Sequence, residues 1–201
     1  MTASPLIGPV RSFAAYCTDH AAPASAEELG EPRCDPGATP DGVPLRAPFV
    51  GATLVTVDAP DADERHLHLA VALANGVYGQ RIGEEFPGYQ EFEVLEMKVV
   101  HSRLLVHIRE TMAERDWVDD EETMRGFVEV QRDEHLTICG RGASGGVSCL
   151  PPVSLETWDQ RANQRTYAVE ARLLGPERLL LRDRMKGASS RAAGIHRLVF
   201  P

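Results

Sequence analysis

From residue 49 onward, apolar and polar residues alternate with the period of two that is typical of β-strands. The clearest case is residues 65–73, where leucines and a valine occupy every second position and histidines or alanines stand between them. The alternation predicts a strand that buries Leu67 and Leu69 on one face and places His66 and His68 on the other. Histidines at such positions are commonly plain polar residues that face solvent.

The same pattern recurs along the rest of the chain and predicts about ten short strands. Residues 91–100 and 103–110 form the clearest hairpin, and the parity of their apolar positions shifts between Val94 and Leu95, which predicts a β-bulge. The acidic residues 111–125 are expected to form a loop or one short helix. The predicted strands comprise residues 49–57, 65–73, 77–82, 91–100, 103–110, 127–132, 135–139, 153–158, 165–174, 177–184 and 195–200.

Short strands with almost no helix indicate an all-β protein: an antiparallel β-sandwich or barrel in mostly meander order. Residues 1–48 lack periodicity and are rich in proline, glycine and alanine, which predicts an irregular arm. We therefore expect an N-terminal arm over residues 1–48, tied down by a disulfide, followed by a single antiparallel β domain over residues 49–201.

The composition limits the partners that the protein can have. A formal net charge of -9 disfavours nucleic acid and anionic membranes, which attract clustered cations. No apolar run approaches the ~20 residues of a transmembrane helix. Nearly all basic residues are arginines, since only Lys98 and Lys186 are lysines, and we interpret this excess as a compositional bias instead of a phosphate site.

Four cysteines form two local pairs in the sequence, Cys17 with Cys34 and Cys139 with Cys149. Local pairs without a C-x-x-C motif are typical of disulfides and not of a zinc site. This favours a protein of the periplasm, the cell envelope or the extracellular space, whose leader is removed from the mature chain, because the N-terminal apolar run is too short for a signal peptide. The alternative is four free thiols in the cytoplasm.

Gly142-Ala-Ser144-Gly-Gly146 matches the G-x-S-x-G pattern of serine hydrolases. That nucleophile requires a turn between a strand and a helix, whereas proline follows here and no helix is expected. The cysteine-flanked form CGRGASGGVSC resembles the serine loop of trypsin-like proteases over eleven residues. Those enzymes carry an aspartate where this chain has Ala143, and their Ala-Ala-His-Cys context is absent. Ser144 therefore remains a weak catalytic candidate, and the resemblance assigns no family.

His66 and His68 share a predicted strand face, and His107 is the best third ligand from a neighbouring strand. This makes a weak metal-site candidate, which lacks the glutamate expected of a cupin-like centre. No cofactor is predicted.

Three further residues are candidates for binding contacts: Trp117 and Trp158, which lie near predicted loops, and Arg141, which begins the glycine loop. We expect an exported, non-catalytic β domain that binds or scaffolds a protein or envelope partner. The alternatives are a barrel for a small apolar ligand, a hydrolase that depends on a metal or on Ser144, and a protease inhibitor that presents residues 141–148 as a clamped loop.

Overall fold

The computed structural model describes residues 1–20, 34–36, 45–58, 65–85, 90–117, 124–142, 145–185 and 193–200. Across these ranges the chain forms fourteen strands and one helix, and the strands make two antiparallel sheets. The predicted all-β class is therefore confirmed. None of the described helical residues forms a segment that is long and apolar enough to cross a membrane.

The smaller sheet has five strands in the order β2-β6-β5-β4-β3, and all neighbours are antiparallel. One face buries alternate residues of β5, including Leu67 and Leu69, as the sequence predicts. The strands are β2 (Ile7–Val10), β3 (Cys34–Pro36), β4 (Phe49–Asp58), β5 (Arg65–Leu73) and β6 (Gly76–Glu85).

The larger sheet has nine strands, and its main path runs β1-β10-β9-β11-β12-β13-β14. Strand β8 pairs with the other side of β9, and β7 pairs with β8. The strands are β1 (Ser4–Pro5), β7 (Gln90–Val100), β8 (Arg103–Trp117), β9 (Met124–Arg141), β10 (Val147–Cys149), β11 (Val153–Asp159), β12 (Gln164–Gly175), β13 (Arg178–Asp183) and β14 (Gly194–Arg197).

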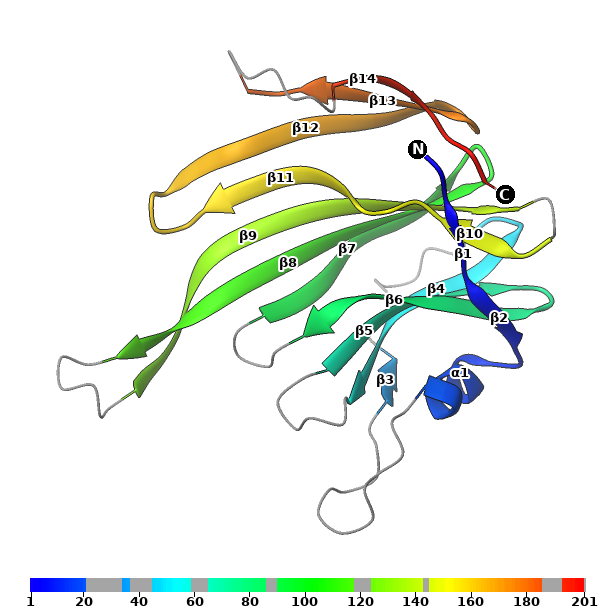
Figure 1. The fold of residues 1–201 in the computed structure, drawn as a ribbon, viewed down its shortest axis with the longest axis horizontal. Coiled ribbons are helices and arrows are strands. Elements are labelled where there is room, and N and C mark those ends of the chain that lie inside the picture. The colour runs from blue at the N-terminus through cyan, green and yellow to red at the C-terminus, as the bar shows by residue number, and fades with distance from the viewer. Residues whose placement is uncertain are drawn as a thin grey trace, which may run out of the picture.

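The β8–β9 hairpin is the centre of the molecule, because it carries a hydrophobic core on each face. Leu104 and Val106 face the smaller sheet, whereas Leu105 and Ile138 face the opposite way. On that opposite side the larger sheet curls back, so that β12 and β13, together with Leu198 after β14, pack on the hairpin. Figure 1 shows the resulting three tiers, with the smaller sheet below, β7–β9 in the middle and β11–β14 above.

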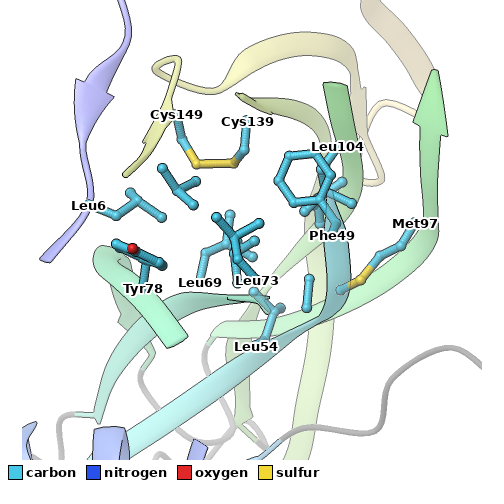
Figure 2. Packing of buried hydrophobic residues seen from close by; sticks show 14 of the residues in the cluster. Leu6, Phe49, Leu54, Leu69, Leu73, Tyr78, Met97, Leu104, Cys139 and Cys149 are labelled. Carbon is cyan, nitrogen blue, oxygen red and sulfur yellow. A yellow bond between two sulfur atoms is a disulfide. The ribbon is translucent and has the colours of Figure 1, made fainter. Parts of the chain in front are cut away.

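The first core contains the disulfide between Cys139 and Cys149 (Figure 2). The two cysteines are directly opposite in the register of β9 and β10, and each is buried. Figure 2 shows the bridge above side chains of the smaller sheet, with Phe49 and Tyr78 nearby. Leu6, from the N-terminal segment, completes this core, so residues far apart in the chain meet at the bridge.

The segment predicted as an irregular arm has regular structure over residues 1–20 and 34–36. Strand β1 pairs with β10 of the larger sheet and β2 pairs with β6 of the smaller sheet. Helix α1 (Phe13–His20) then lies against the outer face of the smaller sheet, where Phe13, Tyr16 and Cys17 contribute to an apolar cluster. Ser12 caps its first turn, since its hydroxyl accepts a hydrogen bond of 3.1 Å from the backbone N–H of Ala15.

Two predictions about the β8–β9 hairpin were wrong. Strand β8 continues to Trp117 and β9 begins at Met124, so much of the predicted loop or helix over 111–125 is extended hairpin. Strand β9 also runs without a turn through Asp133 and Glu134, where two separate strands were expected. In both places charged side chains replace the apolar alternation from which strands were predicted. At the second place Arg109 and Glu134 form an ion pair across β8 and β9, and such cross-strand pairs stabilise a sheet. The predicted bulge near Val94 is present, as the register shifts between Val94 and Glu96.

Candidate functional site

The predicted Cys139–Cys149 disulfide is confirmed. It connects β9 and β10 inside the protein, because both cysteines are buried in the first core. Cys17 is also disulfide-bonded. The side chain of Cys34 lies outside the described residues, so its pairing with Cys17 stays a prediction.

The glycine loop between the two cysteines leads from β9 directly into strand β10. Two backbone hydrogen bonds hold this loop. The N–H of Gly142 donates to the carbonyl oxygen of Gly146 at 2.9 Å, and the N–H of Gly145 donates to the carbonyl oxygen of Gly142 at 3.0 Å. Arg141 bends back onto this loop, where its Nε donates to the carbonyl oxygen of Gly145 at 3.2 Å. Ser144 lies outside the described residues, and its role stays a prediction.

His68 is buried and does not face solvent as the alternation predicted. Helix α1 covers this face of β5, and the hydroxyl of Tyr16 shares a hydrogen bond of 3.0 Å with Nδ1 of His68. Burial raises the pKa of Tyr16 to about 12, so the phenol stays neutral at ordinary pH. The ring of His66 lies 6.5 Å from that of His68, measured between centroids. His68 therefore belongs to the packing of the helix on the sheet.

His107 lies on the other sheet, on the face of β8 that points away from the smaller sheet. Its Nε2 is 2.9 Å from Oε2 of Glu134. Arg109 joins the same carboxylate, with Nη2 3.2 Å from Oε1 of Glu134 and Nη1 3.1 Å from Glu93 on β7. Glu134 thus accepts hydrogen bonds from two side chains, and the polar cluster extends across β7, β8 and β9.

A second histidine–glutamate pair occupies the opposite face of the same hairpin. Glu110 accepts hydrogen bonds from Nε2 of His135 at 3.3 Å and from the Gln90 amide at 2.5 Å. The bond from His135 lowers the pKa of Glu110, burial opposes this, and the bond from Gln90 lowers it further. The carboxylate is therefore held in its charged form by its own neighbours.

The structure does not bring His66, His68 and His107 together. His66 and His68 lie on β5, on the face of the smaller sheet that points away from the first core, whereas His107 lies on β8 of the larger sheet. Among the described residues, no group of three or more histidine, cysteine, aspartate or glutamate residues is arranged to hold a metal ion.

Trp158 is half-buried on β11, and the guanidinium of Arg165 lies 5.7 Å from its ring centroid. Arg165 also pairs with Glu156 at 3.2 Å, so the indole is covered by a local charged contact. Trp117 ends strand β8, and its side chain is outside the described part of the chain. The proposed binding roles of both tryptophans stay predictions.

The outward face of β12, β13 and β14 is a further candidate surface, because it has exposed side chains, several arginines and a groove. The inward rows of β12 and β13 belong to the second core, for example Leu173 beside Leu179. The outward rows alternate arginine with aliphatic residues. These outward residues are Arg172, Leu174, Arg178, Leu180, Arg182, Ile195 and Arg197, together with Glu170.

A groove of about 510 Å³ opens on this face beside the β12–β13 turn. Leu174, Pro176 and Ile195 form its apolar wall, and Arg178, Arg197 and Glu177 supply its charges. Its volume is within the range of small-molecule sites, ~300–1,000 Å³. Two of its apolar side chains are open to solvent, since Ile195 is 62% exposed and Leu174 is 36% exposed.

The two arginines of this groove form an unusual pair. Arg178 and Arg197 are directly opposite in the antiparallel register of β13 and β14. Like charges in that position repel each other across the strands. Within the part of the chain that the structure describes, neither guanidinium forms an ion pair. The two positive charges of the groove therefore lack an ion-pair partner there, and they lie beside apolar surface and one carboxylate, that of Glu177.

This face was missed in the sequence because its arginines were interpreted as compositional bias. The signal was present in Arg178-Leu-Leu-Leu-Arg182, where an arginine stands at each end and the buried leucines alternate with the half-buried Leu180. Only the register of β13 with β14 brings Arg197 and Ile195 beside it.

Comparison with protein-family models, with curated proteins and with solved structures finds no match to this chain.

Proposed function

We propose that this protein is a non-catalytic binding module that works in the cell envelope or the extracellular space. The observation that carries the proposal is the outward face of β12–β14, where arginines and exposed aliphatic side chains surround a groove. Exposed apolar side chains that are interleaved with one sign of charge are typical of recognition surfaces. The rest of the chain is acidic, so this face is also distinct in charge.

The buried disulfide supports the proposed location. Disulfides persist in oxidising compartments and are rare in the cytosol, where thiols are kept reduced. Cys139 and Cys149 lie inside the core that joins the two sheets, and the bridge therefore belongs to the stable structure. A chain that depends on this bridge folds best after export.

A binding role without catalysis accounts for the polar clusters. The two histidine–glutamate pairs lie on opposite faces of one hairpin, and their carboxylates are already occupied by neighbouring donors. Such cross-strand pairs stabilise a sheet, and this is the role that the proposal gives them.

Two measurements test this proposal. Fractionation of cells that express the native gene is expected to recover the protein outside the cytosol. A purified sample is expected to stay unlabelled by a fluorophosphonate probe and to contain no stoichiometric metal. Recovery from the cytosol contradicts the location, and labelling at Ser144 replaces the binding role with that of a serine hydrolase.

A further inference from the structure

We infer that the groove on β12–β14 binds a fatty acid, a ligand with one carboxylate and an unbranched apolar chain. The inference rests on the proposed binding function and names its ligand class. It follows from the two parts of the groove, a pair of arginines and an apolar wall, which meet at the β12–β13 turn.

The arginine pair supplies the site for the carboxylate. Arg178 and Arg197 repel each other across β13 and β14, and a carboxylate between them removes this repulsion. Each guanidinium donates charge-assisted hydrogen bonds in a planar geometry that suits a carboxylate. Glu177 also lines the groove, and its charge acts on Arg103, where it opposes the effect of burial on the pKa of that arginine.

The apolar wall supplies the site for the chain. Ile195 stands two residues before Arg197 on the same face of β14, and its exposed side chain is next to the arginine pair. Leu174 lies at the irregular end of β12, where the register shifts, and Pro176 follows in the turn. Covering these side chains with an alkyl chain removes apolar surface of both partners from water.

Charge selects this ligand over larger partners. A second copy of the chain, placed symmetrically on this face, would bring a further pair of arginines against the first. An anionic membrane or nucleic acid would meet the net charge of -9 carried by the whole chain. A small ligand with a single negative charge escapes this repulsion, because its charge lies directly at Arg178 and Arg197.

Isothermal titration calorimetry of the full oxidised chain tests the inference, with sodium dodecanoate below its critical micelle concentration. One molecule is expected to bind per chain. Acetate, which lacks the chain, and dodecanol, which lacks the charge, are each expected to bind at least about tenfold more weakly. Higher salt is expected to weaken the binding of dodecanoate.

Matched variants locate the site. The double variant Arg178→Gln/Arg197→Gln is expected to lose about tenfold or more in affinity, because both charge-assisted contacts are removed. Ile195→Ser is expected to weaken binding severalfold. Arg182→Gln is the control, since Arg182 is exposed on the same face of β13 but does not line the groove. Circular dichroism verifies that each variant is folded.

Absence of dodecanoate binding overturns the inference, as does equal binding by the double variant or equal binding of dodecanol. A dimer that dissociates in Ile195→Ser, together with no detectable binding of dodecanoate, also overturns it and assigns the face to a second copy.

These results are independent of the proposed function, because they use purified protein. If the protein is oxidised and located outside the cytosol but binds no dodecanoate in the titration, the ligand alone is rejected. Recovery of reduced protein from the cytosol rejects the proposed function.

Discussion

The hydroxyl of Tyr16 and Nδ1 of His68 share a hydrogen bond of 3.0 Å, which joins helix α1 to strand β5 across 52 positions of sequence. Both side chains are buried. Around them lie the apolar residues of the cluster between helix and sheet, including Val55 and Val77. This buried polar contact therefore fixes the N-terminal helix to the outer face of the smaller sheet.

Tyr16→Phe is expected to lower the free energy of unfolding by about 0.5–1.5 kcal/mol, because the buried hydrogen bond to His68 is lost. Urea unfolding monitored by circular dichroism measures the change. Tyr167→Phe is the matched control: Tyr167 is half-buried in the second core, and its hydroxyl has no hydrogen bond among the described residues. Equal stability of the two variants would show that the Tyr16–His68 contact does not stabilise the fold.

Gly79→Ala tests the close contact of the helix with β6. A Cβ at Gly79 would overlap the ring of Tyr16, whereas a Cβ at Gly51, under the same helix, would meet Phe13 at an ordinary 3.8 Å. Gly79→Ala is therefore expected to destabilise the protein by about 1–3 kcal/mol through overpacking. Gly51→Ala is expected to change stability by less than about 1 kcal/mol. Thermal unfolding of both variants checks this, and a neutral Gly79→Ala contradicts it.

The Glu110 pair predicts a pH dependence. The hydrogen bond from His135 lowers the pKa of Glu110 below its ordinary value of 4.5, and the bond from Gln90 adds to this against the effect of burial. Folding then favours the charged carboxylate. The stability that it contributes is complete above pH 4.5, the value expected when unfolded, and is lost as the pH falls through the lowered pKa.

Glu110→Gln is accordingly expected to make the loss of stability between about pH 5 and 3 shallower, by on the order of 1 kcal/mol. Urea unfolding at a series of pH values measures this slope. Glu170→Gln, an exposed position on β12, provides the control. An acid profile of Glu110→Gln that matches the native protein would mean that this carboxylate does not contribute to acid unfolding.

The strands that alternate cleanly were predictable from sequence, and the reason is visible in β5. Its predicted bounds match the structure because a complete apolar row faces the first core. The turn at His101 and Ser102 was also predictable from the two flanking runs, and both residues adopt left-handed φ angles of 50° and 60°. By contrast, the distal part of β8–β9 carries charged residues where an apolar row would be expected, so a hydrophobic pattern did not reveal it.

Helix α1 and the groove on β12–β14 were missed for different reasons. The helix has only eight residues, and its buried positions Tyr16 and Cys17 and the partly buried Phe13 were hidden in an alanine- and proline-rich context. The groove depends on the register between β13 and β14, which local pattern does not determine. The Cys139–Cys149 bridge was found because its two partners are close in sequence as well as in space.

The most direct test of the account is the thiol state of Cys139 and Cys149 in protein taken from its native cells. The sample is denatured without reductant, alkylated with iodoacetamide and analysed by peptide mass spectrometry. We expect neither cysteine to carry an adduct and the two peptides to remain linked until reductant is added. Complete alkylation of both cysteines in the unreduced sample would contradict the proposed working place outside the cytosol.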